Sequence, residues 1–172
     1  MTRMHTIQAS FYTELDSPVG RLWLLGDDSG LSGLYMHEQR HRPDLPAGCE
    51  PSDKPFKEVK VQLKAYFAGK LLRFDLPLRG AGTAFQERVW RELRKIPFGE
   101  LDSYGAIARR LGNANASRAV GLANGKNPIG IIVPCHRVVG ASGALTGYAG
   151  GLERKQWLLA HEQRVSQRSA HA

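Results

Sequence analysis

The chain has 172 residues, of which 42% are hydrophobic and 23% charged, and it contains two cysteines. This composition indicates one folded domain or two small ones and excludes disordered and disulfide-rich proteins; because no segment is apolar enough for a membrane span or a secretory signal, we expect a soluble cytoplasmic protein. The formal net charge of +8 is uneven: residues 1–81 carry 11 basic and 10 acidic side chains, whereas residues 82–172 carry 13 and 6.

The first half of the chain has the pattern of a small α/β unit. Three segments rich in β-branched, aromatic and aliphatic residues are separated by turn sequences, which predicts strands over 6–15, 21–25 and 31–36. Residues 37–55 are polar and rich in proline, which predicts a surface loop or a partly disordered excursion. Apolar residues then recur at helical spacing, which predicts a helix over 56–67 that Gly69 ends.

The second half begins after a linker at 76–82 and is mainly helical. Thr83 and Gln86 form a capping-box sequence, which places the start of a helix at Thr83. Ser103 can cap the next short helix, and a further short helix is predicted over 115–124. Two short helices joined by a glycine turn form a helix-turn-helix pattern. Because this half is strongly basic, we expect it to contact nucleic acid, although a basic surface can also serve solubility alone.

Beyond these helices, the apolar run 129–133 predicts a buried strand that Pro134 closes. A final helix is predicted over 152–162, followed by a polar tail over 163–172. The domain prediction is therefore a first domain of residues 1–81 and a second of residues 82–172.

Cys135 is the strongest candidate for chemistry. It follows Pro134 directly and is flanked by His136 and Arg137, whose imidazole and guanidinium would favour the nucleophilic thiolate. The alternative is a buried cysteine that only fills space. Because neighbouring side chains of an extended segment point to opposite faces, His136 could act on Cys135 only through a turn or an intervening water.

Two further segments could contribute to a site. The helix-turn-helix carries four cations able to contact phosphates, namely Arg109, Arg110, Arg118 and Lys126. It also has a face of small residues that would let its backbone approach another surface, namely Ala116, Ala119 and Ala123. Tight packing inside the protein explains the small face equally well. The glycine-rich stretch 140–151 could form a flexible pocket wall with Tyr148 as a lid, or a plain surface loop.

The sequence Pro-Cys-His-Arg-Val at 134–138 resembles the core motif of the O6-alkylguanine-DNA alkyltransferases. Supporting motifs are Ser103-Tyr104, SRAVG at 117–121, GKNP at 125–128, Gly147-Tyr148 and KQWLLAHE at 155–162. The resemblance is strong over about residues 82–162 and looser before them. It implies a ribonuclease-H-like α/β N-terminal domain and a mainly helical C-terminal domain with a helix-turn-helix.

The resemblance also implies a role for each residue that matches the motif. Cys135 would accept the alkyl group, His136 would take the thiol proton through a water, and Glu162 would orient the imidazole. Tyr104 would hydrogen-bond the base, and Asn127 would brace the turn beneath the site. The remaining implied contacts are substrate-binding residues Val138, Tyr148 and Ala149, and DNA-binding residues Ser103, Ala116, Arg118, Ala119, Ala123, Lys126 and Arg137, with Arg118 entering the base stack.

The implied activity is irreversible, single-turnover transfer of the alkyl group from O6-alkylguanine, and from O4-alkylthymine, in duplex DNA to Cys135. No metal or cofactor is implied. The expected partner is double-stranded DNA, held through minor-groove and phosphate contacts. The protein is expected to be a monomer that can cluster on DNA. Two other readings remain: a non-catalytic lesion sensor, and a Cys–His hydrolase acting on small acyl substrates. The N-terminal part lacks the cysteine cluster of relatives that bind zinc.

Overall fold

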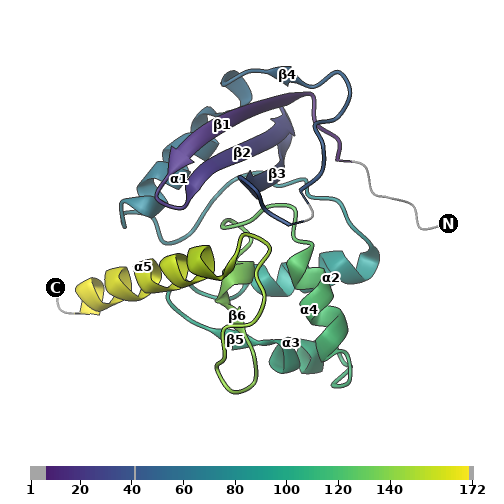
Figure 1. Ribbon diagram of the computed structural model, residues 1–172, viewed down its shortest axis with the longest axis vertical. Helices are drawn as coiled ribbons and strands as arrows, with labels where there is room; N and C mark the ends of the chain where they lie inside the picture. Colours follow the sequence, from purple (N-terminus) through teal and green to yellow (C-terminus); the bar gives the residue numbers. More distant parts are fainter. Residues whose placement is uncertain (1–6, 41, 171–172) are drawn as a thin grey trace.

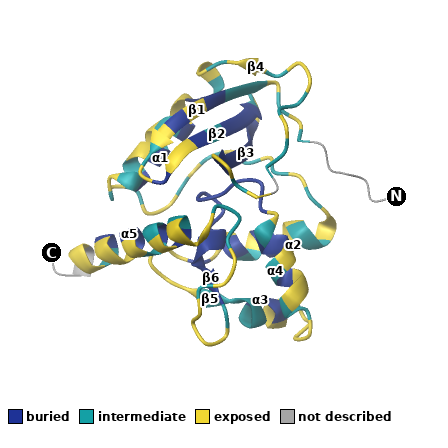
Figure 2. Ribbon diagram, viewed as in Figure 1, coloured by how far each residue is buried: buried dark blue, intermediate teal, exposed yellow. Residues whose placement is uncertain are grey.

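A computed structural model describes residues 7–40 and 42–170. A small sheet with one helix forms the N-terminal part of the described chain (Figure 1). In the C-terminal part, four α-helices and one 3-10 turn surround a pair of short strands (Figure 1). One continuous core runs through both parts (Figure 2). None of the described helices is long and apolar enough to cross a membrane.

The N-terminal sheet has the strand order β3-β2-β1-β4. β1 (Phe11–Ser17) and β2 (Gly20–Asp27) form a tight antiparallel hairpin, and β3 (Gly30–Met36) continues it as the edge strand. β4 (Glu50–Pro51) pairs with β1 in parallel and lies within the predicted loop. The three predicted strands are confirmed, but the first begins at Phe11, since residues 7–10 do not form strand; Thr6, with which it was expected to begin, lies outside the described residues.

One helix packs on this sheet. The 3-10 turn η1 (Lys54–Phe56) leads into α1 (Lys57–Phe67), which buries Val59, Leu63 and Tyr66. Gly69 follows with φ of +75°, a conformation that favours glycine, and so ends the helix as predicted.

The helices of the C-terminal part begin where the capping signals place them. α2 (Ala84–Arg94) has the full capping box of Thr83 and Gln86, and α3 (Tyr104–Arg110) is capped by Ser103, whose hydroxyl accepts from the amide of Ala106. α3 and α4 (Ser117–Gly125) form the predicted helix-turn-helix. The short strands β5 (Asp102–Ser103) and β6 (Val138–Val139) pair in parallel and bring the start of α3 beside the segment after Cys135.

Two sequence predictions are wrong. Residues 129–133 form a buried turn with a single bridge at Ile129, not a strand, because apolar runs report burial and not extension. The predicted polar tail is also wrong over most of its length, since α5 spans Leu152–Ala170. Val165 is buried on the inner face of this helix, so the helix gains packing well beyond Glu162. Residues 171–172 lie outside the described part.

The two parts meet along the open edge of the sheet. The amide of Leu34 in β3 donates to the carbonyl of Pro128 at 2.8 Å, and the amide of Gly130 donates back to Leu34 at 3.1 Å. A second bridge joins Leu31 to Leu78. The edge of β3 is therefore covered by the segment that leads to Cys135.

Candidate active site

Cys135 lies in a turn. Residues Cys135–Arg137 form the 3-10 turn η2, in which the amide of Arg137 donates to the carbonyl of Pro134 at 3.0 Å. Cys135 and His136 thus share a single tight turn and are both buried. The objection that applies to neighbours in an extended segment does not apply to this conformation.

The side chain of Asn127 holds the turn that precedes Cys135 in place. Its side-chain amide donates to the carbonyl of Val133 at 2.8 Å, and its Oδ1 accepts from the amide of Ile129 at 3.0 Å. The turn between these points contains Ile131 at φ of +69°, a strained conformation for a β-branched residue. Asn127 and the full burial of Ile131 hold the turn in this shape.

His136 is paired with Glu162 of α5. Its Nε2 lies 2.7 Å from Oε2 of the carboxylate, and both side chains are buried. Since hydrogen bonds and charges from His136 and Arg137 outweigh burial and hold the pKa of Glu162 far below its usual range, the carboxylate is ionised and can only accept. Nε2 therefore carries the hydrogen. Nδ1 has no partner among the described residues and, in the neutral ring, is free to accept a proton.

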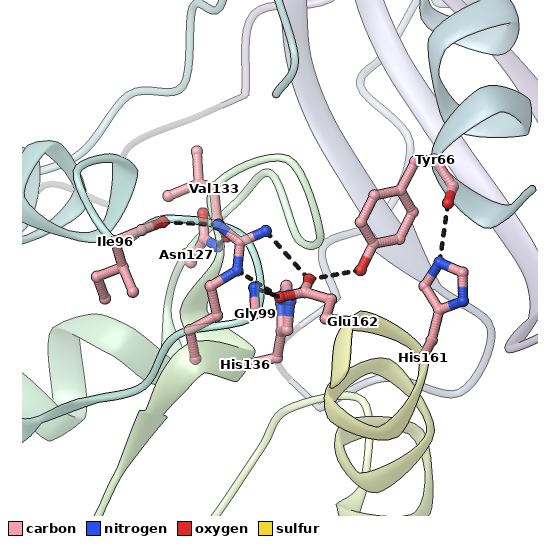
Figure 3. A network of polar contacts seen from close by, with 9 residues as sticks. Tyr66, Ile96, Gly99, Asn127, Val133, His136, His161 and Glu162 are labelled. Carbon is pink, nitrogen blue, oxygen red and sulfur yellow. Dashed lines mark hydrogen bonds and ion pairs between the residues drawn. The ribbon is translucent and has the colours of Figure 1, made fainter. Parts of the chain in front are cut away.

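Glu162 receives hydrogen bonds from four residues of three different segments (Figure 3). Oε1 accepts from the Arg137 guanidinium at 2.8 Å and from the Gly99 amide at 3.1 Å. Oε2 accepts from His136, from Arg137 at 3.0 Å and from the Tyr66 hydroxyl at 2.7 Å. A buried carboxylate with so many donors is fixed in orientation as well as in charge.

Arg137 is not on the surface. Its guanidinium is buried, and besides Glu162 it donates to the carbonyl of Ile96 at 2.7 Å. The expectation that Arg137 contacts DNA is therefore wrong, because its donors are used inside the protein. The sequence does not distinguish a buried arginine from an exposed one when the partner carboxylate is 25 positions away.

The titrating groups of the turn are shifted toward their neutral forms. Burial raises the pKa of the Cys135 thiol, and the Asn127 amide and the charge of Lys155 only partly oppose it. Burial also lowers the pKa of His136, although its pairing with Glu162 acts in the opposite direction. Near neutral pH the site thus holds a thiol beside an uncharged imidazole, which is the state in which the imidazole can act as a base.

The walls around the turn come from the glycine-rich stretch and from α3. Tyr148 lies close enough to Cys135 that a charge on the sulfur would raise the pKa of its phenol, which burial already raises strongly. The Ala149 carbonyl accepts from the amide of Arg40 at 2.9 Å. The hydroxyl of Tyr104, at the start of α3, accepts from Thr146 at 3.2 Å. The glycine-rich stretch is thus attached to its surroundings at several points.

Lys155 is a further buried residue of this wall. Its ammonium group donates to the carbonyl of Val138 at 2.7 Å and to that of Thr146 at 2.9 Å. Lys155 belongs to the KQWLLAHE motif at 155–162, but the resemblance implies no role for it. No signal in the sequence predicts that an ammonium group will be buried against two carbonyls.

The exposed face of α4 is formed by Arg118, Ala119, Leu122 and Lys126. Leu122, which no sequence motif singles out, is 66% exposed, more than any other large hydrophobic side chain among the described residues. Its helical spacing from Arg118 and Ala119 was the signal that could have found it. Ala116 is half-buried, and Ser103 is used as a cap.

Ala123 is not on that face. It is buried, and its carbonyl accepts from the indole N–H of Trp90 in α2 at 2.9 Å. The expectation that Ala123 contacts DNA is wrong: at this position the small residue serves the packing of α4 on α2.

No cluster of three or more His, Cys, Asp and Glu side chains placed to hold a metal ion occurs within residues 7–40 and 42–170. The second cysteine, Cys49, is partly exposed in the loop between β3 and α1.

Two family models match the chain. Residues 84–164 match the 6-O-methylguanine DNA methyltransferase DNA-binding domain, and residues 10–79 match the ribonuclease-like domain of the same proteins. Together the two models include the helix-turn-helix, the Cys135 turn and Glu162 in one domain, and the sheet with α1 in the other.

Curated relatives and solved structures agree with these models. The methylated-DNA–protein-cysteine methyltransferase of Mycolicibacterium paratuberculosis is 54% identical over 90% of this chain and 93% of its own. That of Methanosarcina acetivorans is 49% identical over 87% and 96%. The crystal structure of Mycobacterium tuberculosis OGT in complex with DNA superposes with a TM-score of 0.85 at 52% identity, over 90% of this chain and 94% of that one.

Proposed function

Because the chain belongs to the 6-O-methylguanine DNA methyltransferase family, we propose that Cys135 is the residue that accepts the alkyl group from the damaged base. The protein is a methylated-DNA–protein-cysteine methyltransferase that repairs DNA by direct reversal. Within this activity, we assign scaffold functions to residues 1–81 and DNA binding and alkyl acceptance to residues 82–172.

The observation that supports this assignment is the pairing in the Cys135 turn. Glu162 fixes His136 through Nε2 and leaves Nδ1 available for a proton. A water between Nδ1 and the sulfur would carry the thiol proton to the imidazole, because burial keeps the sulfur protonated until it reacts. Glu162 then stabilises the imidazolium that forms.

The proposed reaction is a single displacement. The sulfur of Cys135 attacks the alkyl carbon, the bond between that carbon and O6 breaks, and O6 keeps the electron pair. The Tyr104 hydroxyl hydrogen-bonds to the departing base and helps to neutralise it, and the proton taken up by His136 is returned to the guanine. The products are S-alkylcysteine and unmodified guanine, so each protein molecule reacts once.

We assign recognition of the base to the pocket wall. The carbonyls of Cys135 and Val138 would accept from the guanine amino group, and Tyr148 with the Ala149 amide would close over it. Because the Val138 carbonyl oxygen already accepts a hydrogen bond from Lys155, the guanine amino group would donate to the second lone pair of that oxygen. O4-alkylthymine also has an alkylated oxygen beside a ring nitrogen, so a pocket that recognises this feature in guanine would accept it too.

DNA is the partner, and we propose that α4 enters its minor groove. Chemistry on a base requires that the nucleotide be flipped out of the stack, at a cost of a few kcal/mol. Arg118 is exposed at the start of α4 and would fill the gap in the stack, while Ala119 lets the helix backbone approach. Lys126 and the neighbouring phosphate contacts would make binding independent of sequence. The protein would act as a monomer able to cluster on DNA.

Mass spectrometry after incubation with DNA that contains O6-methylguanine tests the proposal. We expect the protein to gain one CH2 unit, located on Cys135, after one equivalent of substrate, and Cys135→Ala to gain none. Tight binding of damaged DNA by the wild type without an adduct would instead indicate a lesion sensor. Repeated turnover on an activated ester would indicate a hydrolase.

A further inference from the structure

The catalytic pair proposed above is contacted by a residue of the N-terminal domain. Tyr66 lies in the last turn of α1, is fully buried, and donates its hydroxyl hydrogen to Oε2 of Glu162 at 2.7 Å (Figure 3). This is the same oxygen that His136 contacts. Tyr66 and His136, together with the Arg137 guanidinium at 3.0 Å, thus share the charge of one carboxylate oxygen.

Tyr66 is held firmly in this position. Its ring packs edge-on against Phe98 and His161, with centroids 5.9 and 5.2 Å away. Its carbonyl oxygen lies 2.8 Å from Nε2 of His161, which must carry the hydrogen because a carbonyl can only accept. Two successive residues of α5, His161 and Glu162, therefore bind the backbone and the hydroxyl of the same tyrosine.

The hydroxyl stays protonated, and so remains a donor, near neutral pH. Burial, together with the negative charge of Glu162, raises the pKa of Tyr66 well above its ordinary value. The phenol is therefore not a proton-transfer group in the reaction. Its possible effects are to fix Oε2 in space and to draw charge from it.

We propose that Tyr66 is a positioning residue for alkyl transfer, by which the N-terminal domain holds Oε2 of Glu162 toward His136 and limits how strongly that oxygen stabilises the imidazolium. This inference rests on the proposed roles of Cys135 and His136. A carboxylate oxygen that loses one donor keeps more charge for the donors that remain, His136 among them. Removing the Tyr66 hydroxyl should therefore make His136 easier to protonate.

The other groups that face the pair stay in place when only this hydroxyl is removed. The charged or titratable groups around His136 and Glu162, in addition to Tyr66, are Cys135, Arg137, Tyr148 and Lys155. None of them is bonded to the Tyr66 hydroxyl in the described contacts. A shift in the titration of His136 would thus report on that hydroxyl.

The test compares Tyr66→Phe, which keeps the ring packing, with Tyr35→Phe, which removes a hydroxyl from a buried tyrosine of β3. The His136 imidazole is titrated by NMR in unreacted protein, and the rate of reaction with free O6-benzylguanine is measured against pH. We expect the Tyr66→Phe midpoint to rise by about half a pH unit or more, with the acid limb of the rate moving with it. Tyr35→Phe should match the wild type.

An unchanged midpoint, or a rate lowered equally at every pH, would mean that Tyr66 only supports the structure and would overturn the inference. If Tyr66→Phe does not fold, 3-fluorotyrosine placed at position 66 keeps the donor and strengthens it. The midpoint should then fall, and an unchanged midpoint again overturns the inference. The NMR titration requires no alkyl transfer, so it can be carried out whether or not the protein reacts. A wild type that forms no adduct would therefore contradict the proposed function but not the role of Tyr66.

Discussion

The ammonium group of Lys155 donates to the carbonyl of Val138 at 2.7 Å and so attaches α5 to the strand that follows the Cys135 turn. Its second bond, to the carbonyl of Thr146, fixes the glycine-rich stretch to the same point. The side chain is fully buried, and burial lowers its pKa. One cation therefore sets the distance between two walls of the proposed base pocket.

Replacing Lys155 by Met should impair both the pocket and the fold. Met keeps most of the volume but leaves the buried carbonyl of Val138 and the part-buried carbonyl of Thr146 without this donor, which costs about 1–3 kcal/mol for a buried group left unpaired. We expect a lower free energy of unfolding and a rate with free O6-benzylguanine reduced about tenfold or more. Arg164→Met, on the exposed side of α5, is the matched control and should change neither. Wild-type rates in Lys155→Met would show that the pocket does not depend on this bond.

Stability should decrease as the pH falls below about 6.5, the ordinary pKa of histidine. Because burial lowers the pKa of His136 in the folded state, the unfolded chain takes up a proton first, and each pH unit in this window costs up to about 1.4 kcal/mol. The depressed pKa of Glu162 adds a further loss below the ordinary glutamate range. Denaturant unfolding between pH 7 and pH 5 measures the slope.

The variant His136→Gln should flatten that slope between pH 6.5 and 5, even if it lowers stability at every pH. His37→Gln, which alters an exposed histidine, should keep the wild-type slope. Equal slopes in all three proteins would show that His136 is not the group responsible.

Arg118→Ala should separate DNA binding from chemistry. We expect affinity for a duplex that contains O6-methylguanine to fall about tenfold or more, because the gap left by the flipped base is no longer filled. The rate with free O6-benzylguanine should remain within about twofold of the wild type, since Arg118 lies on the exposed face of α4. Arg164→Ala removes the same charge elsewhere and should affect neither. Equal losses in both assays would contradict the proposed insertion of Arg118.

Asn127→Ala should destabilise the turn beneath Cys135. The substitution removes the donor to Val133 and the acceptor for Ile129, so roughly 2–4 kcal/mol of stability should be lost. The turn should also lose its fixed shape, because the strained Ile131 is no longer held from both sides. Chemical denaturation and the rate with free base together report the two effects. Asn113→Ala, in the exposed turn before α4, provides the control.

The local signals of the sequence predict much of this fold. Thr83, Ser103 and Gly69 begin or end helices where their chemistry requires, since capping depends only on residues a few positions apart. The turn at 129–133 was misread because an apolar run cannot distinguish a buried turn from a buried strand. The continuation of α5 past Glu162 was missed because its support is a buried valine among polar neighbours.

The site was predictable only where one motif contains it. Cys135 and His136 are adjacent in the sequence, whereas the donors to Glu162 come from segments up to 96 positions away. Arg137 was placed on the DNA side because its charge is visible in the sequence and its burial is not. No motif singles out Tyr66, and only the three-dimensional arrangement shows its hydroxyl bonded to the carboxylate.

The bridge between Leu34 and the 128–130 segment has a consequence for how the protein can be divided. β3 is the edge strand of the sheet; the linker pairs with it at Leu31, and the C-terminal part supplies the backbone groups that cover it at Leu34. An isolated N-terminal fragment would expose the unpaired amide and carbonyl of Leu34 in a largely apolar edge strand, which is a template for intermolecular strand pairing. Cutting the chain in the linker should therefore yield an aggregating sheet, so the second domain also acts as the solubilising cover of the first.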